Sequence, residues 1–179
     1  MYATGTGQPH GTAGALKKYK VAVENGSGQD AAAFAAVVDQ VLADPRGWTG
    51  GGSLKLQRVP SSATADVTVF LATPVTSESM CAAGGLHTAQ FTSCYLPGKV
   101  IINLARWLTG VTGYPSVDAY RKFAVNHELG RFLGNAVEGC PKTGKPAPVM
   151  MQQTLGLKGC TANPWPYIDG QIYSGPKVP

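Results

Sequence analysis

The sequence predicts a single α/β domain, and three observations support this fold class. The chain has 179 residues, of which 44% are hydrophobic and only 14% charged, a composition typical of one compact domain. Strand-like and helix-like patterns alternate along its first two thirds, starting with the strand pattern of residues 19–24. The longest helix pattern, Val117–Leu133, follows a continuous apolar strand at Val100–Leu104. We detect no internal repeat and no second domain.

Four strands are predicted from their apolar patterning. Tyr19–Glu24 alternates apolar and polar residues, as a half-buried strand does. Leu54–Val59 and Asp66–Ala72 are two further strands, separated by the turn-forming sequence Pro60-Ser61-Ser62. The more continuously apolar Val100–Leu104 is typical of a central strand.

Two helices are predicted with their ends. Asp30 is a suitable N-cap for an apolar run at helical spacing, which the sequence Asp44-Pro45-Arg46-Gly47 ends. Ser116 is a suitable N-cap for Val117–Leu133, and Gly134 stands where a left-handed C-cap would end that helix. Beyond Gly134 the sequence predicts loops.

The chain is predicted to consist of a flexible segment over residues 1–17, rich in Gly and Thr, and a domain over residues 18–179. Its net charge is +5, but the basic residues are scattered, so we expect no nucleic-acid partner. No apolar run is long enough to cross a membrane. We expect a monomer.

The four cysteines predict two disulfides, Cys81–Cys94 and Cys140–Cys160, although other pairings remain open. Their intervals do not fit a C-x2-C zinc site. Each bond should stabilise the fold by about 3 kcal/mol. Disulfides indicate an oxidising compartment, so we expect a secreted or cell-surface protein. Residues 1–14 lack the features of a signal peptide, so we expect no leader in this chain.

The long helix contains a sequence that resembles the metzincin zinc motif H-E-x-x-H-x-x-G-x-x-H. His127, Glu128 and Gly134 match this motif, whereas Arg131 and Val137 stand where the second and third histidines belong. Downstream, Ala147–Thr154 resembles the Met-turn of the same enzymes, with Met150 expected to support the site from below.

From about Lys18 to Trp165 the chain also resembles a family of actinobacterial secreted or membrane-anchored domains of unknown function. Members carry the full three-histidine motif and look like zinc metallopeptidases, with the Glu as general base. The resemblance implies a zincin-like fold: a twisted mixed sheet, a backing helix and a long active-site helix. The matching stretches are residues 21–24, 44–48, 101–107, 120–128, 140–141 and 147–154.

The departures from the motif predict that the chain holds no zinc and no other cofactor. A guanidinium has no lone pair for a metal and its charge repels a dication, so Arg131 cannot replace a histidine. Val137 offers no donor atom. His87, Glu138 and Asp169 are the residues that could rebuild a metal site, which is the less favoured alternative.

Three functions follow from these residues, and the first is preferred. In the first, the protein is a repurposed metallopeptidase scaffold that binds a peptide or peptide-like ligand in the ancestral cleft through Arg131, Gln152 and Gln153. In the second, His127, Glu128 and Arg131 perform acid–base catalysis without metal. An ion pair between Glu128 and Arg131 is expected from their i, i+3 spacing. In the third, the protein is a zinc peptidase with substitute ligands.

Overall fold

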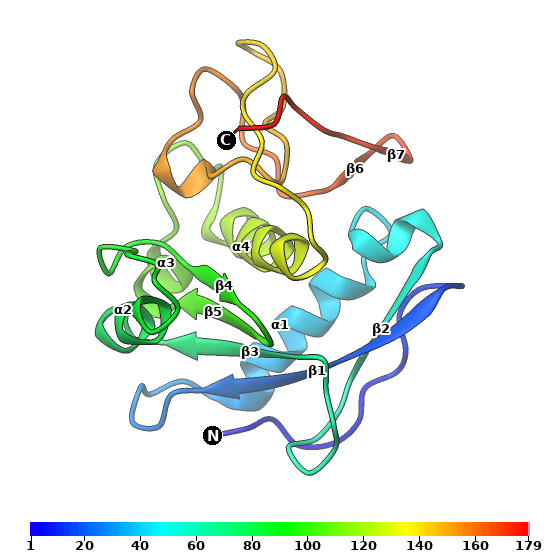
Figure 1. The fold of residues 1–179 in the computed structure, drawn as a ribbon, viewed down its shortest axis with the longest axis vertical. Coiled ribbons are helices and arrows are strands. Elements are labelled where there is room, and N and C mark those ends of the chain that lie inside the picture. The colour runs from blue at the N-terminus through cyan, green and yellow to red at the C-terminus, as the bar shows by residue number, and fades with distance from the viewer. Residues whose placement is uncertain (179) are drawn as a thin grey trace.

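We describe the protein from a computed structural model, which covers residues 1–178 (Figure 1). It has a mixed α/β architecture, which confirms the predicted class. The main sheet contains β1 Ala15–Val23, β2 Leu54–Arg58, β3 Val67–Ala72, β4 Cys94–Leu96 and β5 Lys99–Asn103. The α-helices are α1 Ala31–Ala43, α2 Pro74–Ala82, α3 Leu104–Thr109 and α4 Val117–Phe132. Short 3-10 turns span Trp48–Gly51 and Gln153–Leu155, and β6 Tyr167–Ile168 forms a hairpin with β7 Gln171–Ile172.

The main sheet has the strand order β2-β1-β3-β5-β4 and is mostly parallel. β1, β2, β3 and β5 pair in parallel, with Val21 opposite Val69 and Val69 opposite Val100. Only β4 runs antiparallel, beside β5. β2 and β4 are the two edge strands, β5 lies next to β4, and β3 occupies the centre of the sheet.

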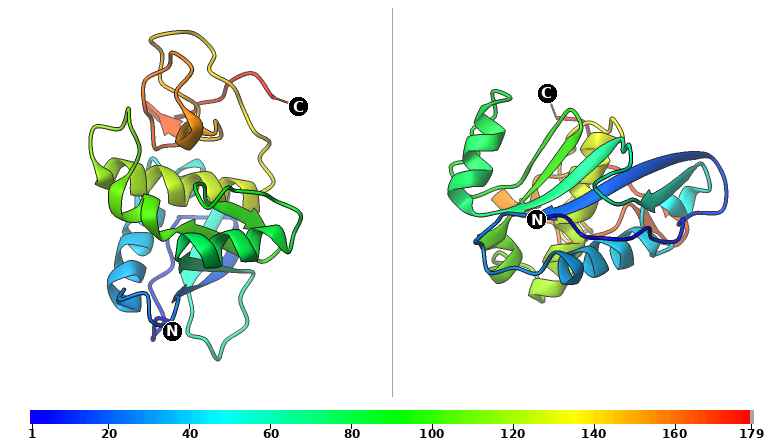
Figure 2. Two further views of the ribbon diagram at one scale, coloured as in Figure 1. Left: turned by 90° about the vertical axis from the view of Figure 1, so that its left-hand side faces the viewer. Right: turned by 90° about the horizontal axis from the view of Figure 1, so that it is seen from below.

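Helices cover both faces of this sheet (Figure 2). Alternating side chains of one strand point to opposite faces, so neighbouring residues of β5 join different cores. Ile102 belongs to the main core, which α1 and α4 cover, whereas Ile101 packs with Cys81 in the smaller core under α2. α4 lies between the sheet and the loops that follow it, so its central residues are buried all round (Figure 1).

The helix caps were predicted correctly. The Asp30 side chain accepts a hydrogen bond from the Ala33 N–H at the start of α1, and Ser116 accepts one from the Ala119 N–H at the start of α4. Leu133 is the C-cap of α4, and Gly134, which follows it, has a φ of 88°, in the left-handed region that favours glycine. These caps determine where the helix of the candidate motif begins and ends.

Residues 1–17, predicted to be a flexible segment, lie against the sheet in the structure. The Ala3 N–H donates to the Val21 carbonyl, and His10 exchanges backbone hydrogen bonds with Leu56 on β2. β1 already begins at Ala15. Hydrogen bonds from the backbone do not depend on side-chain type, so a segment rich in Gly and Thr can still cover a sheet edge.

Both predicted disulfides are confirmed. Cys81–Cys94 joins α2 to β4, and Cys140–Cys160 joins two loops of the C-terminal part. As expected, residues 134–178 contain little regular secondary structure. Across the described chain, none of the helices combines the length and the apolar character that crossing a membrane requires.

Candidate functional site

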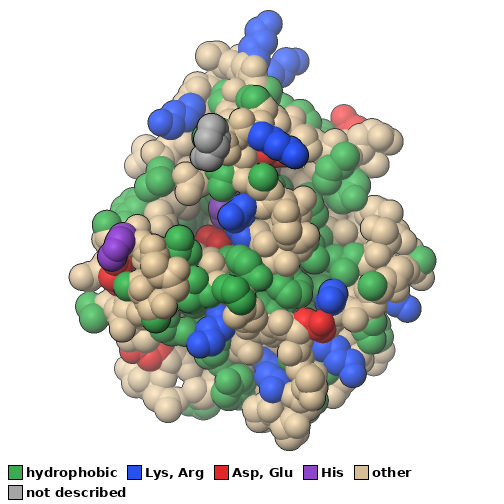
Figure 3. All heavy atoms as spheres, in the orientation of Figure 1, with side chains coloured by type: hydrophobic (Ala, Val, Ile, Leu, Met, Phe, Trp, Pro, Cys, Tyr) green, Lys and Arg blue, Asp and Glu red, His purple; other side chains and the backbone are tan. Residues whose placement is uncertain are grey.

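The central feature of the candidate site is a cavity of about 220 Å³ beside α4. Its lining includes His127, Glu128 and Arg131 from α4 and Val137 from the turn that follows. The rest of its wall comes from Phe123 of α4, from residues 86–88 and 92–95, and from Gln152, Thr154 and Leu155. The face in Figure 3 is hollowed near its centre, where a basic, an acidic and a histidine side chain gather. The structure thus brings all four central motif positions to one cavity.

His127 is 8% exposed and in its neutral form has a defined tautomer. Its Nδ1 lies 2.8 Å from the carbonyl oxygen of Val149, which can only accept a hydrogen bond, so Nδ1 carries the proton. Nε2 therefore keeps its lone pair. Burial lowers the pKa of His127 to about 4; the hydrogen bond to Val149 opposes this shift, and the charge of Arg131 contributes to it. At neutral pH the imidazole is uncharged.

Glu128 is 6% exposed, and its carboxyl group makes no hydrogen bond to any residue that the structure describes. Burial raises the pKa of Glu128 to about 8, although the positive charge of Arg131 opposes the shift. At neutral pH the side chain is therefore mostly a neutral carboxylic acid, which can donate a hydrogen bond.

The predicted ion pair between Glu128 and Arg131 is wrong. Within residues 1–178 no ion pair joins these side chains, and the Arg131 Nη1 instead donates to the Asn135 carbonyl oxygen at 2.6 Å. The left-handed Gly134 turns the chain back, so that the Asn135 N–H bonds to the Gly130 carbonyl. This turn places the Asn135 carbonyl within reach of the guanidinium, and helical spacing alone did not reveal it.

The segment predicted to support the site runs directly against α4. Val149 supplies the carbonyl that orients His127, and the Met150 sulfur occupies the space where a Cβ on Gly130 would stand. Gly130 therefore permits close packing of Met150 on the helix, one turn after His127. Met150 and Val149 are both buried in the main core.

Gln152 and Gln153, both predicted to bind ligand, have different environments. Gln152 is exposed and lines the cavity. Gln153 is 1% exposed and its side chain is fully used: Oε1 accepts from the Tyr114 hydroxyl and the Asn163 N–H, and Nε2 donates to the Pro148 and Asn163 carbonyls. The prediction for Gln153 is wrong, because this side chain ties the loops together.

Zinc does not fit this site. Arg131 and Val137 provide no metal donor, and of the possible substitutes only His87 lines the cavity. His87 pairs with Glu78 at 3.7 Å, Glu138 accepts from the Gly175 N–H, and Asp169 is in the β6–β7 turn. Among residues 1–178 no three His, Cys, Asp or Glu side chains come together as a metal ligand set.

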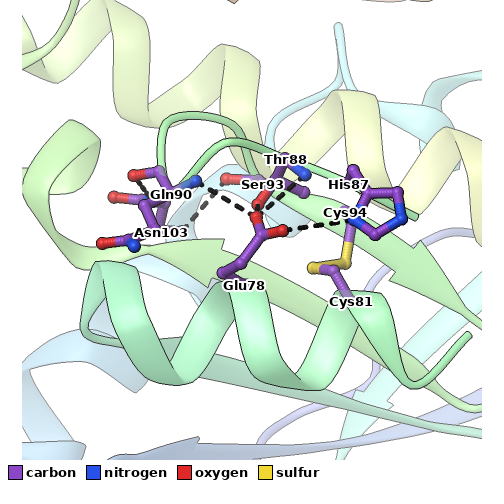
Figure 4. The surroundings of a disulfide bond; sticks show 8 residues. All are labelled: Glu78, Cys81, His87, Thr88, Gln90, Ser93, Cys94 and Asn103. Atoms are coloured by element: carbon purple, nitrogen blue, oxygen red, sulfur yellow. Dashed lines mark hydrogen bonds and ion pairs between the residues drawn. A yellow bond between two sulfur atoms is a disulfide. The ribbon is translucent and has the colours of Figure 1, made fainter. Parts of the chain in front are cut away.

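Sequence patterning does not predict how the loop before β4, which contributes Thr88 to the cavity lining, is held in place by Glu78 of α2 (Figure 4). Its carboxylate accepts hydrogen bonds from the Thr88 N–H at 2.9 Å, the Thr88 hydroxyl and the Gln90 N–H at 3.1 Å. These bonds, the Thr88 hydroxyl first, lower the pKa of Glu78. The neighbouring Cys81–Cys94 bond ties the same loop to α2. A single Glu in an unpatterned stretch has no recognisable motif.

Comparison with known proteins identifies a family. The family described as "Protein of unknown function (DUF3152)" matches residues 2–168. No curated protein and no solved structure matches the chain significantly.

Proposed function

We propose that this chain, which belongs to the DUF3152 family of proteins of unknown function, is a metallopeptidase-like scaffold without a zinc site that binds a peptide or peptide-like ligand. One observation carries the proposal. Arg131 and Val137, at the motif positions of the second and third histidines, line the same cavity as His127 and Glu128. This shared cavity supports a zincin-like site in which two metal ligands have been replaced.

The proposed zincin-like fold is supported by the arrangement around α4. The mixed sheet ends in an antiparallel edge strand, α1 packs on the same sheet face as α4, and the left-handed Gly134 ends the long helix. The contacts of Val149 with His127 and of Met150 with Gly130 support the proposal that this segment corresponds to a Met-turn. The two disulfides support an origin in an oxidising compartment, and we include secretion or display at the cell surface in the proposal.

Peptide binding is supported by the walls of the cavity. Cys94 and Tyr95 belong to β4 and also line the cavity. Because β4 pairs with β5 on one side only, its other side offers backbone donors and acceptors, to which an extended peptide can add as a further strand. Leu86 and Leu155, both exposed, provide apolar surface beside these polar groups.

Filling the cavity should abolish peptide binding. We expect immobilised wild-type protein to retain members of a random hexapeptide pool, detected by mass spectrometry, and Val137→Trp to lose at least nine tenths of this retention. A Trp side chain occupies much of a cavity of about 220 Å³. Leu108→Trp, which adds the same bulk at an exposed site on α3, is the matched control and should bind normally. No retention by the wild type, or equal retention by both variants, would contradict binding in this cavity.

A second candidate function is metal-independent acid–base catalysis in the same cavity. The observation that favours it is that burial shifts the pKa values of two adjacent residues in opposite directions. The pKa of His127 is lowered to about 4, and that of Glu128 is raised to about 8. Under this hypothesis neutral Glu128 donates a proton, His127 Nε2 accepts one, and Arg131 stabilises developing negative charge.

Glu128→Gln separates the two functions. If the protein is an enzyme, this variant should cleave any hexapeptide substrate of the wild type at least 100-fold more slowly. Its circular dichroism spectrum should remain unchanged. Arg121→Gln, outside the cavity, is the control and should retain turnover. If the wild type binds hexapeptides but leaves them intact on prolonged incubation, catalysis is rejected and binding remains.

A further inference from the structure

Arg131 brings a positive charge into the cavity, and no carboxylate of residues 1–178 forms an ion pair with it. The guanidinium has five N–H donors, and within residues 1–178 it forms one hydrogen bond, from Nη1 to the Asn135 carbonyl oxygen. Across residues 1–178 the guanidinium has no ion-pair partner. The bond to Asn135 fixes one end of the planar group, so its remaining donors are held in place before any ligand arrives.

The two buried neighbours do not neutralise this charge. Within the described chain, the Nε2 atom of His127 has no hydrogen-bond partner. The carboxyl group of Glu128, a residue that is 6% exposed, has none either. Burial favours the uncharged form of both groups. Both groups line the cavity together with the guanidinium, so all three offer hydrogen-bonding atoms to a ligand that enters it.

The charge favours a ligand with a single negative charge. A carboxylate matches the guanidinium fork and can accept two hydrogen bonds from it. It can accept another from the protonated Glu128. A doubly charged phosphate would bring one negative charge more than Arg131 balances, into a site that also contains the Glu128 carboxyl.

The size and the walls of the cavity restrict which part of a ligand it can hold. Its volume of about 220 Å³ is below the roughly 300–1,000 Å³ of sites that enclose whole small molecules, so it suits the end of a longer ligand. Phe123 and Val137 add apolar lining, and Leu86 and Leu155 are 43% and 59% exposed. The open edge of β4 reaches the same cavity and can hold the preceding residues in an extended form.

We infer that the cavity binds the C-terminal carboxylate of a peptide whose last side chain is apolar, with Arg131 as the partner of that carboxylate. The inference rests on the proposed function and specifies its ligand. Arg131, which prevents zinc binding, thereby becomes the main determinant of ligand choice.

Two peptide pools test this inference. Both contain random hexapeptides that end in Leu, one with a free carboxylate and one with a C-terminal amide, and retention on immobilised protein is measured by mass spectrometry. We expect the wild type to retain the free acids at least tenfold more strongly, because a charge-assisted bidentate pair is lost in the amides. Arg131→Gln should reduce this preference to less than twofold. Arg131→Lys should keep part of it, since the charge remains without the fork.

Lys142→Gln is the matched control, because it removes the same charge from an exposed loop residue, and it should bind as the wild type does. Equal retention of acids and amides by the wild type would overturn the inference but leave peptide binding intact. Retention of neither pool would overturn both. A preference that survives Arg131→Gln would show that another cation binds the carboxylate. Competition by acetate or N-acetyl-leucine as strong as that by the hexapeptide acids would identify a small organic acid, in place of a peptide, as the ligand.

Discussion

The free energy of unfolding is expected to fall by about 2 kcal/mol between pH 6.5 and pH 8, and Glu128→Gln is expected to abolish this fall. Burial raises the pKa of Glu128 from 4.5 to about 8, so the folded protein holds this proton more tightly than the unfolded chain. Its contribution to stability is fully present below pH 4.5 and is lost as the pH rises to 8.

His127 has the opposite effect and determines where the fall begins. Burial lowers its pKa from 6.5 to about 4, so its contribution is present above pH 6.5 and is lost as the pH falls toward 4. Between pH 4.5 and 6.5 the two groups offset each other. Above pH 6.5 only Glu128 still changes, over about 1.5 pH units at about 1.4 kcal/mol per unit.

Urea unfolding at a series of pH values measures this effect directly. The free energy of unfolding of the wild type should be constant from pH 4.5 to 6.5 and then fall. That of Glu128→Gln should rise up to pH 6.5 and then remain constant. Glu138→Gln removes a carboxyl outside the cavity lining and should follow the wild-type profile. A wild-type stability that stays constant from pH 6.5 to 8 would show that Glu128 is already ionised in the folded protein.

The elements that the sequence predicts well are those whose signals are local. α1 and α4 combine helical spacing with an N-cap side chain, and their first residues agree with the structure. The two disulfides could also be predicted, because the four cysteines form two pairs that are close in sequence. α2 and β4 were missed, because α2 lacks a clear apolar face and β4 has only three residues. Their position depends on contacts with the sheet and on Cys81–Cys94, which local patterning does not contain.

The candidate site shows the same division between local and distant determinants. The zinc motif predicts that residues of α4 and the following turn share one site, because their spacing on a helix is fixed, and the cavity includes His127, Arg131 and Val137. The partners of these side chains come from elsewhere. The Asn135 carbonyl depends on the turn after Gly134, and the network of Gln153 depends on three loop segments. No spacing rule predicts such contacts.

Removal of the Cys140–Cys160 bond by Cys140→Ser with Cys160→Ser is expected to lower the free energy of unfolding by about 3 kcal/mol. The bond spans 20 residues of sequence, and this loop contains the segment that packs under α4. Without it the unfolded chain gains conformational entropy, while few regular hydrogen bonds hold residues 141–159 in the folded state. Urea unfolding of the oxidised wild type and the variant measures the difference.

Loss of the Cys140–Cys160 bond should also affect the hydrogen bond of His127. Val149 lies inside the loop and supplies the carbonyl bound to His127 Nδ1, so freeing the loop should increase exchange of that imidazole proton with water, which NMR can follow. Cys81→Ser with Cys94→Ser is the comparison, because it opens a shorter loop of 13 residues on the opposite wall. We expect a similar loss of stability there but unchanged exchange at His127. A loss below 1 kcal/mol for the Cys140–Cys160 variant, with slow exchange retained, would mean that packing of Met150 against Gly130 and the Gln153 network already hold the segment in place.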